Sequence, residues 1–82
     1  MRRYSERDLE DLEEAVSTRG YGLLRERMTA ILHDKDLELR KPNDSETTAR
    51  LRSEIEALET CLKLPGLLKR DIAAKIARQE KQ

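Results

Sequence analysis

The chain has 82 residues and a formal net charge of zero, because 17 Lys and Arg balance 17 Asp and Glu. This length allows one small domain with a limited core. One Cys and one His exclude an internal disulfide and argue against a structural zinc site. We therefore expect no metal and no cofactor, and self-association as the remaining source of stability.

The composition favours an all-α protein. Charged residues make up 41% and apolar residues 37% of the chain, with two Tyr and neither Phe nor Trp. This mixture is typical of long helices and coiled coils, although high charge with few aromatic residues also describes disordered chains. The apolar residues recur at regular intervals, and this spacing decides in favour of helices.

The sequence predicts neither a membrane protein nor a nucleic-acid-binding protein. With zero net charge there is no overall field that attracts nucleic acid or a membrane surface. The basic start Met1-Arg2-Arg3 is not followed by an apolar segment, so we expect no signal peptide. No stretch approaches the roughly 20 apolar residues of a spanning helix. We expect a cytoplasmic protein in which Cys61 is a reduced thiol.

The first predicted helix covers residues 5–18. Ser5 is a good N-cap, and Asp8 occupies the reciprocal position of a capping box. The tripeptide Gly20-Tyr21-Gly22 is expected to end or sharply bend this helix. Its apolar stripe, spaced i, i+3 and i+7, consists of Leu9, Leu12 and Val16.

An antiparallel helical hairpin is predicted in the middle of the chain. The second helix covers residues 23–40, Lys41-Pro42-Asn43-Asp44 breaks the chain, and the third helix covers residues 46–63. Two helices of roughly 25 Å with a short connection pack against each other in opposite directions. The 4-3-4 spacing in the third helix is typical of such a seam. The predicted seam residues are Leu24, Met28, Ile31, Leu51, Ile55, Leu58 and Leu62.

A fourth helix is predicted over residues 67–80, because Leu64-Pro65-Gly66 is expected to stop the third. Its apolar face contains Leu68, Ile72 and Ile76. In an antiparallel hairpin Leu23 and Leu62 lie at the same end, so the first and fourth helices should emerge side by side. Two shorter amphipathic helices would then flank the hairpin.

The two terminal helices carry opposite charge. Residues 5–18 hold six acidic residues and one Arg, whereas residues 63–82 hold six basic residues and two acidic ones. Exposed ion pairs each contribute only about 0–1 kcal/mol, so charge selects which faces meet and does not hold them together. Each terminal helix has only three large apolar residues, which favours pairing between chains in a homo-oligomer, with a four-helix monomer as the alternative. The predicted subunit or partner contacts are Leu9, Leu12, Val16, Leu68, Ile72 and Ile76.

The sequence contains no catalytic constellation. His33 begins a polar helical turn, His33-Asp34-Lys35-Asp36, but a general base needs a pocket and a positioned partner. We therefore interpret it as a solvated side chain and expect no enzyme. Cys61, next to a seam position, is interpreted as a small hydrophobe at the edge of the interface, with a redox link between subunits as the alternative.

Two segments have a functional as well as a structural interpretation. In the structural interpretation, Gly20-Tyr21-Gly22 is a tight connection that places Tyr21 over the open end of the hairpin. In the functional interpretation, Arg19, Tyr21 and Arg25 surround a ligand or a loop of a partner. An aromatic ring with two cations suits a phosphate-bearing ligand. Residues 70–77 are similar to the opening helix of a helix-turn-helix, but only five residues follow, so we do not expect DNA binding by this route.

A little over half of the chain carries a resemblance to a known type of protein. Tyr21-Gly22-Leu23-Leu24 is followed by Arg27 and Met28, then by Leu51-Arg52-Ser53-Glu54-Ile55-Glu56-Ala57-Leu58, and then by Leu62-Lys63-Leu64-Pro65. With these segments the chain resembles small helical-hairpin proteins that are frequent in tailed bacteriophages. The resemblance carries over no catalytic residue. It implies a phage or prophage origin, a place in the bacterial cytoplasm or the virion, and a non-enzymatic role.

Three functions follow as hypotheses. The first is a homo-oligomeric, phage-type helical protein that acts by protein–protein contact as a virion accessory or assembly factor. The second is a phage-encoded inhibitor or sequestering protein directed at a host defence component, with its epitope near Arg19 and Arg25 or on the basic fourth helix. The third is a DNA-associated regulator, whose binding would weaken steeply with salt.

Overall fold

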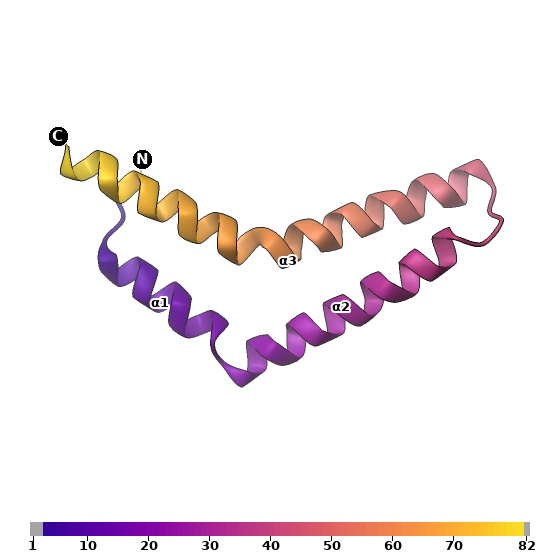
Figure 1. Cartoon of the computed structure of the whole chain (residues 1–82), viewed down its shortest axis with the longest axis horizontal. Coiled ribbons are helices and arrows are strands. Elements are labelled where there is room, and N and C mark those ends of the chain that lie inside the picture. The colour runs from indigo at the N-terminus through magenta and orange to yellow at the C-terminus, as the bar shows by residue number, and fades with distance from the viewer. Residues whose placement is uncertain (1–2, 82) are drawn as a thin grey trace.

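The computed structural model of the chain describes residues 3–81, and in that range the protein is all-helical. Figure 1 shows its three helices in chain order: α1 (Glu6–Val16), α2 (Arg19–Leu39) and α3 (Ser45–Glu80). The prediction of an all-α fold is confirmed. The four predicted helices are wrong in number, because the third and fourth form one helix of 36 residues.

The capping box predicted at the start of α1 is present. The carboxylate of Asp8 accepts a hydrogen bond from the backbone N–H of Ser5 at 2.8 Å. The N–H of Asp8 donates to the carbonyl oxygen of Ser5 at 3.0 Å. These bonds use groups that the first turn of a helix leaves without partners.

The corner between α1 and α2 lies two residues earlier than the glycines indicated. The helix α1 ends at Val16, and Thr18 is the N-cap of α2, with its hydroxyl accepting from the N–H of Tyr21 at 3.1 Å. Gly20 and Gly22 are helical, and no described glycine has a positive φ. The expected break at the glycines is therefore wrong, because a capping hydroxyl, and not a left-handed glycine, sets this boundary.

The predicted connection between the second and third helices is present. The side chain of Asn43 donates to the carbonyl oxygens of Glu38 at 2.8 Å and Lys41 at 3.0 Å, which closes the end of α2. Asp44 caps α3 by accepting from the N–H of Thr47 at 2.7 Å. Hydrogen bonds from Thr47 hold the pKa of the Asp44 carboxyl below its usual value.

Pro65 bends α3 but does not end it. A proline inside a helix lacks an N–H and its ring crowds the carbonyl four residues earlier, here that of Cys61, so the helix kinks. Buried side chains on both sides of Pro65 pack against the other helices, and this packing outweighs the local penalty. Figure 1 shows α3 bending near its middle, opposite the corner between α1 and α2. Because of this bend, α3 can lie along both α1 and α2, which meet at an angle.

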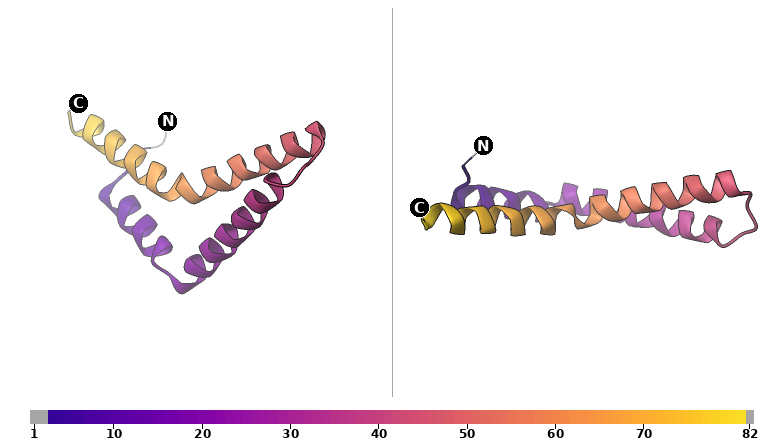
Figure 2. Two further views of the ribbon diagram at one scale, coloured as in Figure 1. Left: turned by 45° about the vertical axis from the view of Figure 1, so that its right-hand side comes forward. Right: turned by 90° about the horizontal axis from the view of Figure 1, so that it is seen from above.

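The helices form two nested angles in a single layer. α2 lies beside the first half of α3 and runs in the opposite direction, while α1 lies beside the second half (Figure 1). Figure 2, seen from above, shows how thin this arrangement is. The Cα atoms extend over 55 × 29 × 15 Å, with a radius of gyration of 17.4 Å. A compact domain of this length has a radius of gyration of about 12 Å.

The core of this layer is small. Its buried side chains are Leu51, Ile55, Ile72 and Ile76, all from α3, and among residues 3–81 no side chain is fully buried. Several large aliphatic side chains remain exposed: Leu23, Leu24, Leu37, Leu64, Leu67 and Leu68. Domains normally have two or more packed layers, so that each helix can bury a broad stripe. In this single layer, each helix buries only a narrow stripe of its side chains.

Candidate functional site

The residues predicted for the seam lie on α2 and α3, which run beside each other, and most of them are at least partly buried. The side chains that are buried or half-buried are Leu51, Ile55, Leu58, Leu62, Met28 and Ile31. Leu24 is 63% exposed. The two helices lie farther apart at the corner than at the connecting loop (Figure 1), and Leu24 belongs to the wide end. Periodicity placed Leu24 on the correct stripe but carried no information about the splay of the helices.

An ion pair joins α2 and α3 in the half of this seam nearer to the connecting loop. Lys35 of α2 donates a hydrogen bond to the carboxylate of Glu54 of α3, and about a third of each side chain is exposed. This hydrogen bond lowers the pKa of the Glu54 carboxyl. The sequence interpretation missed the pair, although Lys35 lies four residues after Ile31 and Glu54 three residues after Leu51. Opposite charges at matching seam positions were the available signal.

The predicted contact residues of the terminal helices meet within one chain. Leu9, Leu12 and Val16 are half-buried, Ile72 is only 4% exposed, and Ile76 is buried as well. Leu68 is 38% exposed and belongs to the apolar surface near the bend. Within the single chain, α1 therefore packs against the second half of α3. No residue of α1 is buried, since most of its packing is against α3 alone.

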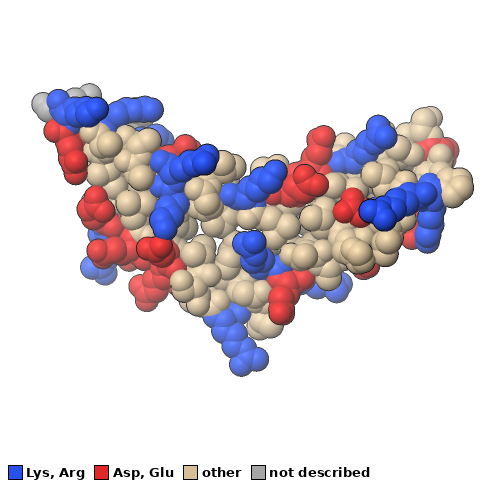
Figure 3. All heavy atoms as spheres, viewed as in Figure 1, with Lys and Arg blue, Asp and Glu red and all other residues tan. Residues whose placement is uncertain are grey.

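Charge is segregated along this contact. Figure 3 shows acidic side chains gathered over α1 and basic ones over the second half of α3. Lys69 donates to the carboxylate of Glu13 at 2.6 Å, and this hydrogen bond with the nearby positive charge lowers the pKa of the Glu13 carboxyl. At the tip, the Tyr4 N–H donates to Gln79 Oε1 at 3.0 Å, and Gln79 Nε2 donates to the Tyr4 carbonyl at 2.8 Å. The Lys75 ammonium lies 5.3 Å from the centre of the Tyr4 ring.

The structure does not bring Arg19, Tyr21 and Arg25 around one ligand. Arg19 and Arg25 line different surface grooves. The hydroxyl of Tyr21 is buried and, within the described part of the chain, has no hydrogen-bond partner. Tyr21 therefore lies inside the corner, closer to its structural interpretation than to a role in a ligand-binding face.

Arg25 instead belongs to a basic groove at the bend of α3. The groove has a volume of about 480 Å³, and its lining is Arg25, Leu62, Lys63, Pro65, Gly66, Leu67 and Arg70. Among residues 3–81, Arg25, Lys63 and Arg70 form no ion pair. The lining contains no carboxylate, so the groove presents three uncompensated cations beside apolar side chains. No sequence pattern predicts this convergence, because it depends on the bend at Pro65.

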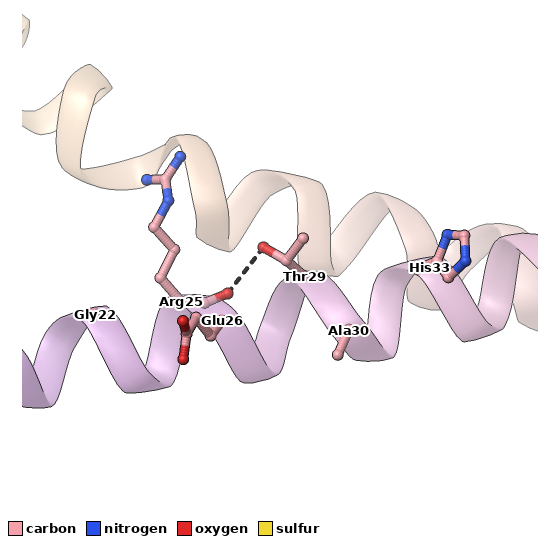
Figure 4. Close-up of a pocket in the computed structure, with 6 residues that line it drawn as sticks. All are labelled: Gly22, Arg25, Glu26, Thr29, Ala30 and His33. Atoms are coloured by element: carbon pink, nitrogen blue, oxygen red, sulfur yellow. Dashed lines mark hydrogen bonds between the residues drawn. The ribbon is translucent and has the colours of Figure 1, made fainter.

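A second groove of about 460 Å³ runs along α2, lined by Gly22, Arg25, Glu26, Thr29, Ala30 and His33. Figure 4 shows Arg25 extending toward the neighbouring helix, while Glu26 and Ala30 point the other way. Thr29 is occupied locally, since its hydroxyl donates to the Arg25 carbonyl at 2.9 Å. With all of its walls on one helix, this groove does not enclose a substrate, and it places no partner around His33.

The remaining candidate residues lie apart on the surface. His33 and Cys61 are both exposed, and Cys61 lies next to the half-buried Leu62. Among the described residues, no group of three or more His, Cys, Asp or Glu side chains is placed to hold a metal ion. Within the same range, no helix combines the length and apolarity needed to cross a membrane.

Comparison of the chain with models of protein families, with curated proteins and with solved structures finds no match.

Proposed function

We propose that this chain is a non-enzymatic helical-hairpin protein that acts by self-association and by contact with protein partners. The supporting observation is the surface that it leaves exposed. The single chain has an accessible surface of 6780 Å². A compact folded protein of 9.6 kDa exposes about 5,100 Å². The excess, about 1,700 Å², is in the range that each subunit of an obligate homodimer buries.

The exposed aliphatic residues support the same proposal. Leu23 and Leu24 lie near the start of α2, and Leu64, Leu67 and Leu68 lie around the bend of α3. Scattered exposed leucines are common on soluble proteins, but a concentration of them near one corner of a thin layer is typical of an interaction surface. A second layer of helices would cover these side chains.

The biological role that we propose is that of a virion accessory or assembly factor. Assembly factors act by contact and need no catalytic pocket. The resemblance to small phage proteins supports this role, and the bacterial host cytoplasm or the virion would be the location. A gene position beside portal or terminase genes would support the proposal, and a position beside counter-defence genes would contradict it.

Light scattering coupled to size-exclusion chromatography tests the self-association directly. At tens of micromolar, we expect a mass of at least twice the 9.6 kDa of one chain. The Leu24→Lys/Leu68→Lys double variant should shift the mass toward one chain, because it places charge on the apolar corner. The Arg27→Glu/Arg52→Glu double variant, with changes at exposed charged positions away from the groove, serves as the control. A strictly monomeric wild-type chain would remove the proposal.

The basic groove favours a second candidate function, a binding protein that sequesters an acidic partner. Three cations without a carboxylate, next to apolar side chains, complement an acidic amphipathic segment. We expect an Arg25→Glu/Arg70→Glu variant to lose a stoichiometric partner that the wild-type chain retains from bacterial lysate. The Arg27→Glu/Arg52→Glu variant makes the same change of charge elsewhere and should retain it. If the wild-type chain and both variants retained the partner equally, the groove would be excluded as its binding site.

A further inference from the structure

We propose that two copies of the chain associate by exchanging α1, so that α1 of each copy packs on the second half of α3 of the other. This inference rests on the proposed self-association and specifies the surface that mediates it. The corner between α1 and α2 is the hinge. The occupant of the contact surface on α3 is therefore a segment of a second copy.

The hinge consists of the two residues between α1 and α2, Ser17 and Thr18. Ser17, with φ −91° and ψ −3°, is close to helical geometry. Thr18 has φ −72° and ψ 153°, so its φ is helical and only its ψ is extended. A rotation of the Thr18 ψ to about −42°, with a smaller change of the Ser17 ψ from −3° toward the same value, would join α1 and α2 into one continuous helix. The corner contains neither a proline nor a left-handed glycine that would oppose the change.

The opened chain would consist of two helices of similar length. The joined helix would run over residues 6–39, about 51 Å, and α3 with 36 residues spans about 54 Å before its bend is counted. Opening separates Leu9, Leu12 and Val16 from Ile72 and Ile76. Each of these contacts is regained when a second opened copy supplies the missing helix. The exchanged dimer thus keeps the contacts between α1 and α3, loses those between α1 and α2, and adds an interface between the copies.

The closed corner is held weakly. α1 has no fully buried residue. The polar contacts between this end of the chain and α3 include the exposed Glu13–Lys69 pair, the hydrogen bonds between Tyr4 and Gln79, and the Lys75 ammonium over the Tyr4 ring. The Tyr21 hydroxyl is buried in the corner without a hydrogen-bond partner among the described residues, which destabilises the closed form. Gly20 and Gly22 lower the helix propensity next to the hinge, so the continuous helix is not favoured overwhelmingly either.

Charge fixes how the exchanged helices pair. The α1 helix is acidic over most of its length, and the second half of α3 is basic (Figure 3). An acidic helix from a second copy meets the same complementary surface that it meets in the closed chain, whereas two α1 helices repel each other. The exchange therefore selects α1 against α3 and disfavours α1 against α1.

Carbodiimide cross-linking of mixed-isotope protein tests the exchange. Equal amounts of ¹⁵N-labelled and unlabelled chain are unfolded together, refolded and treated with a carbodiimide, which joins the carboxylate of Glu13 to the amine of Lys69 as an amide. If α1 is exchanged, about half of the Glu13–Lys69 cross-links in the dimer fraction join a labelled to an unlabelled peptide. The Lys35–Glu54 pair is the internal control, because α2 stays with its own α3, and its cross-links should not mix.

A proline at the hinge provides the second test. Arg19→Pro places proline at the first position of α2, where it is favoured, holds Thr18 extended, and blocks a continuous helix. Glu6→Pro places the same ring at the first position of α1 and leaves the hinge free. Both variants are checked by circular dichroism for unchanged helix content. We expect Arg19→Pro to abolish the mixed Glu13–Lys69 cross-links and lower the dimer fraction at least tenfold, and Glu6→Pro to behave like wild type.

The outcomes separate this inference from the proposed function. If the chains associate but the Glu13–Lys69 cross-links never mix, the second copy docks on the closed chain, and the exchange is wrong while self-association stands. If Arg19→Pro dimerises as readily as Glu6→Pro, the exchange is also wrong. If the wild-type chain does not associate at all, both proposals fail.

Discussion

At the residue scale, three carboxylates of this surface-rich protein stabilise the folded state through specific hydrogen bonds. Asp44 caps α3, Glu13 pairs with Lys69, and Glu54 pairs with Lys35. In each case the hydrogen bond lowers the pKa of the carboxyl below its usual value. Each group is solvent-accessible, so its individual contribution is small, but the three act in the same direction.

Acid should therefore destabilise the fold. A carboxyl whose pKa is lower in the folded than in the unfolded state contributes stability above the unfolded pKa, about 4, and that contribution is lost as pH falls through the folded value. We expect the temperature at the midpoint of thermal unfolding to decrease as the pH is lowered from 6 to 2.5. Circular dichroism measures this temperature. An Asp44→Asn variant, which keeps a weaker cap, should show a smaller fall. An unchanged midpoint across this range would contradict the assignment.

The buried isoleucines should dominate stability residue by residue. Ile72→Ala removes one of the few buried side chains and should lower the free energy of unfolding by about 2–4 kcal/mol. Glu59→Ala, at an exposed position of the same helix, should change it by less than about 0.5 kcal/mol. Urea unfolding at matched protein concentration measures both. Equal effects would show that the second half of α3 does not pack as described.

At the element scale, local chemistry was predictable and tertiary compensation was not. The cap at Ser5 and the break at residues 41–44 follow from the preference of their side chains for helix ends and turns, which the sequence displays directly. Pro65 was misread because the stop depends on a balance between local strain and distant packing. The sequence prediction put the helix boundary at the two glycines, because glycines commonly end helices. Thr18 forms the boundary instead, as a threonine before a helical run can act as an N-cap.

The bend at Pro65 should be required for the nested arrangement. Pro65→Ala restores a backbone hydrogen bond and favours a straight α3, which cannot lie along both arms of the angle between α1 and α2. We expect a larger radius of gyration by small-angle X-ray scattering at equal oligomeric state. Gly66→Ala, whose added Cβ meets nothing within 4 Å, raises helix propensity with the bend retained and should leave the radius unchanged. An unchanged radius for Pro65→Ala would show that another feature bends the helix.

At the scale of the whole molecule, the sequence predicted an under-buried chain, and the structure has the corresponding excess of surface. The sparse apolar stripes on α1 and α3 were sufficient for that prediction. The convergence of Arg25, Lys63 and Arg70 into one groove was not predictable, because those residues come together only through the bend and the corner.

If association supplies the missing burial, thermal stability should depend on protein concentration. A tenfold increase in concentration stabilises a dimer by about 1.4 kcal/mol, which for two chains of this length raises the unfolding midpoint by about 4 °C. Differential scanning calorimetry over two decades of concentration measures this slope. A midpoint independent of concentration, with a monomeric mass, would contradict association.

The thinness of the layer also has a consequence for its internal motion. Among residues 3–81 no side chain is fully enclosed, so few amides are shielded by more than one layer of side chains. The best shielded amides lie around Leu51 and Ile55 and around Ile72 and Ile76, in two islands separated by Pro65, where the hydrogen-bond ladder of α3 is interrupted. Amide hydrogen exchange should therefore be slowest in these two regions. Each region should unfold locally and independently of the other, so that the two halves of α3 behave as separate units.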